Sequence, residues 1–161
     1  NASASAFSTT AVGLATRKLD NYAPSITVRA STDYNSSLTS TATADQSAYG
    51  GVVGMVLYVD QTVVAGTGGT GALTHTVQLQ DPIGGTYVGT TGVIVGTTAV
   101  ATFILQCYPG SGSVAPTSAA VGKADLAVPT RWRINTTSSS SGTNFTYSIS
   151  AVYLPTAASS S

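Results

Sequence analysis

Few side chains in this sequence could carry out acid–base or nucleophilic chemistry. The 161 residues include one histidine, His75, one cysteine, Cys107, and no glutamate. Both residues fall on the apolar face of an alternating segment, so we expect a core or interface histidine and a thiol that packs as a small hydrophobic group. Catalysis of either kind needs several such groups within hydrogen-bond reach of one another. We therefore predict that the protein is not an enzyme.

The acidic residues do not form a recognisable metal or phosphate motif. They are all aspartates, at Asp20, Asp33, Asp45, Asp60, Asp81 and Asp125. Their spacing is not that of a calcium loop, and one His and one Cys on different strands are not a zinc pattern. The glycine-rich run from Gly66 to Gly71 lacks the Gly-Lys-Ser/Thr ending of a phosphate loop. We expect no metal and no cofactor, and we interpret the aspartates as turn residues.

Charge is scarce throughout the chain. Charged residues make up 7% of it and the formal net charge is +0, whereas about 25% is typical. A neutral chain is a poor partner for nucleic acid or for an anionic membrane surface, and no apolar run approaches the roughly 20 residues of a spanning helix. The many Ser, Thr and Val residues favour strands over helices. So few titratable groups predict a melting temperature that changes little from mildly acidic to mildly alkaline pH.

Period-2 alternation of apolar and polar residues is clearest near the C-terminus. Trp132 and Ile134 point to one side of a predicted strand, and Arg131 and Arg133 point to the other. The segment 145–154 alternates in the same way, with its bulky apolar residues on one face. A short polar turn separates the two segments, and this combination predicts a β-hairpin.

Seven to nine such segments, separated by turn residues, indicate an all-β fold. They include strands expected at 73–80, 86–88 and 93–95, with loops expected at 60–71 and 111–128. We predict an antiparallel two-sheet β-sandwich, jelly-roll-like or immunoglobulin-like, with an extended N-terminal arm. The expected divisions are an arm at residues 1–25, the sandwich domain at 26–155 and a C-terminal tail at 156–161. The order of the strands within the two sheets is left open.

Three groups of residues are candidates for contacts with a partner. The segment 52–59 is apolar on both faces and needs cover on both, either from the chain's own arm or from a neighbouring subunit. Arg131 and Arg133 are either solvated arginines with aspartate partners or part of an intersubunit contact. The candidate interface residues are Phe7, Val12 and Leu14 in the arm, Val52, Val56 and Tyr58 in the apolar segment, and Arg131 and Arg133.

Several motifs lie in the second half of the chain. They are Gln80-Asp81-Pro82, Gly85-Thr86-Tyr87, Tyr108-Pro109-Gly110, Val128-Pro129-Thr130-Arg131-Trp132-Arg133, and Phe145-Thr146-Tyr147-Ser148 with Tyr153-Leu154. Through them the segment 77–154 resembles a family of small virion proteins encoded by tailed bacteriophages. The motifs are structural and not catalytic. The resemblance implies a β-sandwich on the virion, as a capsid decoration or cement protein, although some relatives serve on tails or fibres.

The leading hypothesis is therefore a non-enzymatic virion protein on the capsid exterior. Its expected partner is the major capsid protein, and we expect a homo-oligomer, for example a trimer at a local threefold position. The alternative is a carbohydrate-binding or adhesion module of a tail or head fibre. Such a site needs exposed aromatic residues, and the candidates near predicted loops are Tyr34, Tyr49, Tyr87 and Tyr108.

Overall fold

The computed structural model describes residues 25–34, 41–48, 51–66, 72–96, 100–138 and 143–155. Every regular element in these ranges is a β-strand, and the described part of the chain contains no long apolar helix of the kind that spans a bilayer. The strands are β1 (Ser25–Tyr34), β2 (Thr41–Ala42), β3 (Gln46–Ser47), β4 (Val52–Gly66), β5 (Leu73–Gln80), β6 (Tyr87–Gly96), β7 (Ala101–Cys107), β8 (Gly122–Ala124), β9 (Arg131–Ser138) and β10 (Thr143–Pro155). The all-β prediction is confirmed for these residues.

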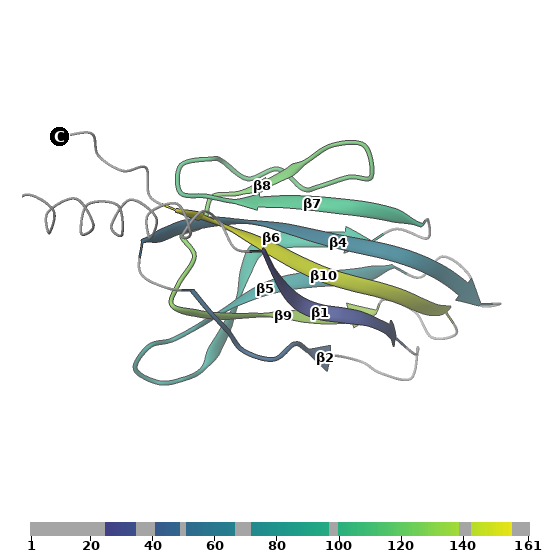
Figure 1. Ribbon diagram of the computed structural model, residues 1–161, viewed down its shortest axis with the longest axis horizontal. Coiled ribbons are helices and arrows are strands. Elements are labelled where there is room, and N and C mark those ends of the chain that lie inside the picture. Colours follow the sequence, from purple (N-terminus) through teal and green to yellow (C-terminus); the bar gives the residue numbers. More distant parts are fainter. Residues whose placement is uncertain are drawn as a thin grey trace, which may run out of the picture.

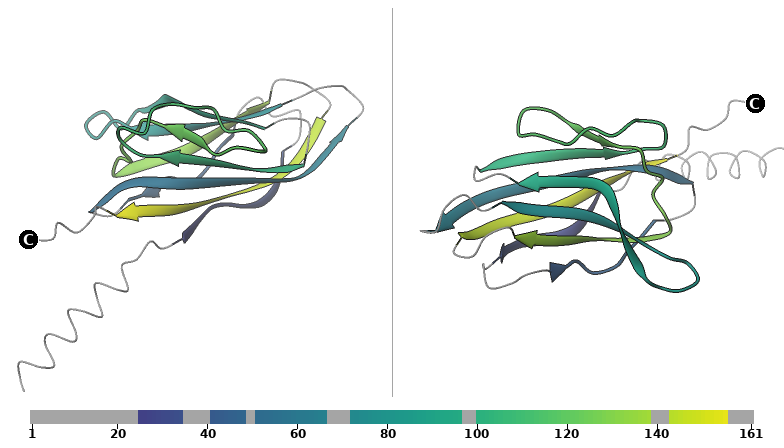
Figure 2. Two further views of the ribbon diagram at one scale, coloured as in Figure 1. Left: turned by 90° about the horizontal axis from the view of Figure 1, so that it is seen from above. Right: turned by 180° about the vertical axis from the view of Figure 1, so that it is seen from behind.

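The strands form two sheets (Figure 1). The first sheet has the order β1-β10-β4-β7-β8, and the second has the order β2-β9-β5-β6, with β3 also paired to β9. All pairs are antiparallel except β7 with β8, which is parallel. Seen from above and from behind, β4 and β10 lie side by side along the length of the first sheet (Figure 2).

The pairing is nested from the ends of the chain inwards. β1 pairs with β10, β2 with β9, β4 with β7, and β5 with β6. The predicted hairpin of β9 and β10 is therefore wrong, because these two consecutive strands belong to different sheets. Each has one apolar face, and alternation identifies such a face without identifying the strand that pairs at its edge.

The strands are longer than the sequence predicted. β4 continues through the expected loop after Asp60 as far as Gly66, because β10 offers it a pairing partner over nearly its whole length. The two short strands expected between Thr86 and Val95 form the single strand β6. β8 interrupts the long loop expected at 111–128. The arm expected at 1–25, apart from Ser25, and the tail expected at 156–161 lie outside the described residues.

One hydrophobic core is shared by the two sheets. The expected inward faces of β9 and β10 are buried, as are alternate residues of β4, β5 and β7. The largest fully buried side chains are Trp132, Tyr34, Tyr147, Tyr153, Phe103, Phe145, Met55, Leu57, Leu73, Leu105 and Ile149. The alternation therefore identified the inward faces of β9 and β10 correctly, although Tyr34 was not expected in the core.

Candidate functional site

The two side chains best suited to nucleophilic or acid–base chemistry, Cys107 and His75, lie in the core. Cys107 is a free cysteine, is fully buried, and burial raises the pKa of its thiol to about 12. His75 on β5 is also buried, and burial together with the nearby Arg29 lowers the pKa of its imidazole to about 3. The expectation of a core histidine and a core cysteine is confirmed.

A small polar cluster surrounds His75 inside the core. Nδ1 of His75 shares a hydrogen bond of 2.9 Å with Oγ1 of Thr136 on β9. The His75 ring also packs against Tyr147 on β10, with 4.9 Å between the ring centroids. The guanidinium of Arg29 on β1 lies 5.9 Å from the centre of the Tyr147 ring and donates a hydrogen bond of 2.8 Å to the carbonyl of Ala42. Nε2 of His75 makes no hydrogen bond to the residues described. The cluster joins both sheets and keeps the imidazole neutral.

Four aspartates accept hydrogen bonds from other groups of the protein. Asp81 accepts a hydrogen bond from the backbone N–H of Ile83 at 2.9 Å, and Asp125 accepts one from that of Gly110 at 2.7 Å. The Asp81 bond confirms the turn interpretation for that residue, whereas Asp125 joins residues 15 positions apart. Asp33 and Asp60 instead accept threonine hydroxyls across strand pairs, at 2.6 and 2.9 Å. Among the described residues, no three His, Cys, Asp or Glu side chains gather where they could hold a metal ion.

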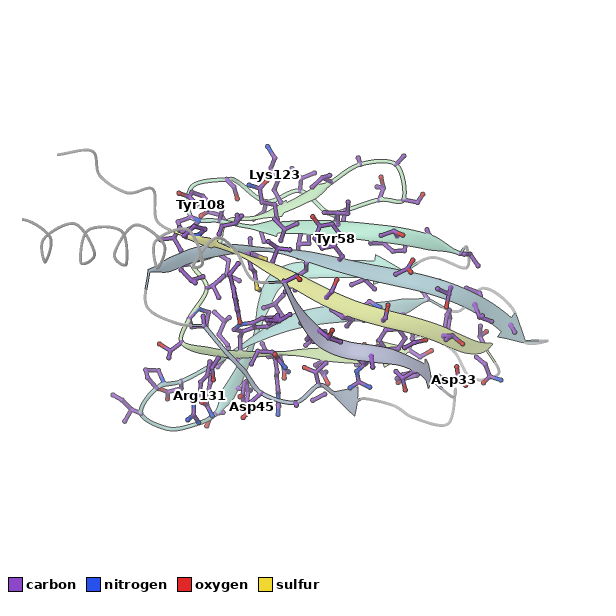
Figure 3. The ribbon with its side chains drawn as sticks, viewed as in Figure 1. Asp33, Asp45, Tyr58, Tyr108, Lys123 and Arg131 are labelled. Atoms are coloured by element: carbon purple, nitrogen blue, oxygen red, sulfur yellow. The ribbon has the colours of Figure 1, made fainter. Side chains whose placement is uncertain are left out.

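The outer surface of the first sheet carries a group of apolar side chains, which we call the outer apolar face. Its members come from three paired strands and the residue after β7: Val56, Tyr58, Ile104, Tyr108, Val152 and Leu154. Val56 is paired with Val152, and Tyr58 with Ile104. The tyrosines are exposed, at 36% for Tyr58 and 39% for Tyr108, and both appear on the near side in Figure 3. None of the six belongs to the core cluster.

A glycine makes room for one end of this face. A Cβ at Gly54 would lie 2.7 Å from the ring of Tyr108 and 2.6 Å from the carbonyl oxygen of Cys107. It would also lie 3.4 Å from Leu154. The ring of Tyr108 can therefore lie over the β4 backbone only because position 54 has no side chain, whereas Leu154 would be in ordinary contact with a Cβ there.

Most of the remainder of the first sheet's outer surface is polar. Thr102 donates a hydrogen bond to Asp60, Thr62 to the carbonyl of Thr146, and the Thr146 hydroxyl to Asp33. The apolar side chains thus gather at the end of the sheet at which β4 begins and β10 ends, and Val63, 45% exposed and paired with Thr146, lies apart from them at the other end. Such a boundary is typical of a contact surface with a polar rim.

The second sheet carries a different surface, built on the two predicted arginines. The Arg133 guanidinium lies over the Tyr87 ring, 3.8 Å from its centre, and its Nε donates a hydrogen bond of 2.8 Å to Oε1 of Gln78. Burial, and then the neighbouring Asp45 carboxylate, raise the pKa of Tyr87. Arg131 is exposed beside this group, and it lies near Asp45 in Figure 3.

The candidate interface residues fall into three sets. Val56 and Tyr58 lie on the outer apolar face, and Arg131 and Arg133 lie on the outer surface of the second sheet. Val52 instead packs against the core, because a register shift at Pro155 disturbs the alternation where β4 begins. Phe7, Val12 and Leu14 lie outside the described residues.

Sequence reasoning missed four members of the outer apolar face. Val152 and Leu154 continue the outward positions of β10, and Ile104 lies on the outward face of β7. Their alternation was visible, but their proximity to Tyr58 depends on which strands pair. Tyr108 was named as an exposed aromatic residue for a sugar site, but its place on this face depends on the contact with Gly54.

The aromatic residues proposed for a sugar site do not gather. Tyr34 is 1% exposed and belongs to the core, so its prediction as an exposed aromatic residue near a loop is wrong. The ring of Tyr87 is covered by Arg133, and Tyr108 is on the other sheet. Tyr49 lies outside the described residues. No pair of described tyrosines from this group therefore forms a stacking platform for a sugar.

Comparison with protein-family models, with curated proteins and with solved structures gives no match for this chain.

Proposed function

We propose that this chain is a non-enzymatic structural protein of a bacteriophage virion, which binds the outer surface of the capsid and stabilises the head. The observation that carries the proposal is the outer apolar face, a surface of paired aliphatic and tyrosine side chains on a sheet whose outer side is otherwise mostly polar. Tyrosines and aliphatic groups surrounded by hydroxyls are typical of the centre of a protein interface.

The architecture we propose is a β-sandwich of the jelly-roll type. The supporting observation is the nested pairing of β1 with β10, β2 with β9, β4 with β7 and β5 with β6. Wrapping such a nested ribbon into two sheets gives the orders β1-β10-β4-β7 and β2-β9-β5-β6, to which β8 is added at one edge. Jelly rolls occur in viral structural proteins and in lectins, so the architecture is compatible with the proposal and does not by itself decide function.

The proposed partner is the major capsid protein. Ser25, where the described chain begins, is paired with Val152 of the outer apolar face. The residues before Ser25 therefore join the fold beside this face, so an N-terminal arm and the face can contact the same capsid surface. In the proposed mechanism a homo-oligomer, such as a trimer at a local threefold position, contacts neighbouring capsid subunits and stabilises their assembled state by mass action.

Replacing Tyr58 with serine is expected to weaken capsid binding by about tenfold or more, because an aromatic side chain at the centre of an interface commonly contributes this much. The measurement is co-sedimentation of the purified protein with capsids assembled from the major capsid protein of the same phage. Val88→Ser is the matched control, since Val88 is an exposed apolar residue of the second sheet. Equal loss of binding in both variants, or in neither, would contradict a role for the outer apolar face.

Deletion of residues 1–16 is expected to abolish capsid binding while leaving the sheets folded. The deleted segment contains Phe7, Val12 and Leu14, the apolar residues proposed to contact the capsid. The same co-sedimentation assay measures binding, and circular dichroism measures folding. Full binding by the shortened chain would rule out the arm as a contact element.

A further inference from the structure

A pocket on the second sheet lies apart from the outer apolar face. It has a volume of about 610 Å³ and is lined by Gln80, Pro82, Pro129, Thr130 and Arg131. One wall is the turn between β5 and β6, and the other is the segment that leads into β9. The lining of the pocket thus combines two prolines with an arginine, a threonine and a glutamine.

Both walls of the pocket are fixed by hydrogen bonds. In the turn, the backbone N–H of Asp81 donates to the carbonyl of Thr86 at 2.8 Å, and that of Gly85 donates to the carbonyl of Asp81 at 2.9 Å. Gly85 has a φ of 68°, which favours glycine. On the other side, the N–H of Ala48 donates to the carbonyl of Thr130 at 2.9 Å. A pocket with fixed walls loses little entropy when a ligand enters it.

The charged groups around the pocket differ in how they are engaged. Arg133 is held by Gln78 and by the Tyr87 ring. The Asp81 carboxylate accepts the N–H of Ile83 within its own turn. The guanidinium of Arg131, by contrast, makes no hydrogen bond or ion pair to any residue that the structure describes. Arg131 is therefore the available charge in the pocket.

A guanidinium in this setting suits a single carboxylate. Arginine binds the two oxygens of a carboxylate through parallel N–H donors. Asp45 and Asp81 add negative charge nearby, which disfavours a doubly charged phosphate more than a singly charged carboxylate. The proline rings of Pro82 and Pro129 offer apolar surface for the methylene groups of an acidic side chain. With the Tyr87 ring covered by Arg133, an aromatic surface for a sugar is missing from the described part of this site.

We propose that the pocket at Arg131 binds the carboxylate of an acidic side chain in an extended segment of a partner protein. Arg131 pairs with the carboxylate, the Thr130 hydroxyl donates a further hydrogen bond, and the two prolines contact the aliphatic part of the side chain. The chemistry of this site does not depend on the proposed capsid function. Only the identification of the partner as the capsid rests on that function.

The test is a titration of the full chain with a blocked Ala-Glu-Ala tripeptide, followed by backbone amide shifts in NMR spectra. Saturable shifts are expected at residues 80–86 and 129–131, and not with the Ala-Gln-Ala tripeptide. Arg131→Gln is expected to weaken binding about tenfold or more. Lys123→Gln is the matched control, because it removes one positive charge from the first sheet, and Figure 3 shows Lys123 far from Arg131.

Three outcomes would overturn the proposal: equal binding of the Glu and Gln peptides, unchanged binding by Arg131→Gln, or tighter binding of glucuronate than of the peptide. Arg131→Lys provides a second variant with the charge kept, for which an intermediate affinity is expected because the two-oxygen contact is lost. The capsid assay with Arg131→Gln separates the two proposals. Peptide binding without capsid binding leaves this site intact and rejects only the capsid as its partner.

Discussion

The melting temperature is expected to fall by about 6–12 °C when the pH is lowered from about 7 to about 4. The cause is His75, which is buried and neutral in the folded protein with a pKa lowered to about 3. The scarcity of titratable groups predicted a nearly constant melting temperature, but that argument counted the groups without their burial. A single buried imidazole is enough to make the free energy of unfolding depend on pH.

The direction follows from the two pKa values of this histidine. The unfolded chain binds a proton below its ordinary pKa of 6.5, whereas the folded chain does so only near 3. Between these values the unfolded state holds more protons, so the free energy of unfolding falls as the pH falls. About 1.4 kcal/mol is lost for each pH unit below 6.5, which gives about 3 kcal/mol at about pH 4.

The His75→Gln variant separates this effect from other acid-sensitive groups. Glutamine is neutral at every pH and can still form a hydrogen bond with Thr136. Thermal unfolding measured at intervals of pH should therefore show a much flatter curve for the variant than for the wild-type protein between about pH 6.5 and 4. If both proteins lose the same stability over that range, the linkage belongs to other groups and the role given to His75 is wrong.

The alternation of apolar and polar residues predicted which face of a strand is buried better than it predicted which strands pair with each other. β5 occupies the bounds expected from the sequence, 73–80, and the inward sides of β9 and β10 are those that the pattern indicated. Each of these statements depends only on neighbouring residues of one strand. The pairing of β4 with β10 joins residues far apart in the sequence, and nothing in the Val52–Val59 pattern identifies that partner.

For the candidate contact surfaces, too, the sequence predicted single outward-facing residues but not their neighbours on other strands. Tyr58 and Val56 were predicted because their apolar character is visible on the outward side of one strand. Ile104 and Val152 join them only through cross-strand pairing. The interaction of Arg133 with Tyr87 likewise depends on strands β9 and β6, which both flank β5. Contact surfaces on sheets are thus harder to predict than cores, because they depend on strand order.

Replacing Trp132 with alanine is expected to lower the free energy of unfolding by about 3–5 kcal/mol. Trp132 is fully buried, and its ring meets that of Tyr153 edge to face, with 6.3 Å between centroids. Its Nε1 donates a hydrogen bond of 3.2 Å to the Tyr153 hydroxyl, which in turn donates one of 3.2 Å to the carbonyl of Ser47. These contacts connect Trp132 of the second sheet to Tyr153 of the first sheet, and Tyr153 to Ser47 of the second sheet.

The consequence of this arrangement is that Trp132 links consecutive strands that share no backbone hydrogen bonds. Trp132→Phe should cost less, about 1–2 kcal/mol, because an aromatic body remains and Tyr153 keeps Ser47 as a partner. Thr137→Ala, on the outward side of β9, is the control and should change stability by less than about 0.5 kcal/mol. Urea denaturation followed by circular dichroism is the measurement, since Trp132 is the only tryptophan and the alanine variant has no indole fluorescence. A cost for Trp132→Ala close to that of the control would show that the two sheets do not depend on this contact for their joint stability.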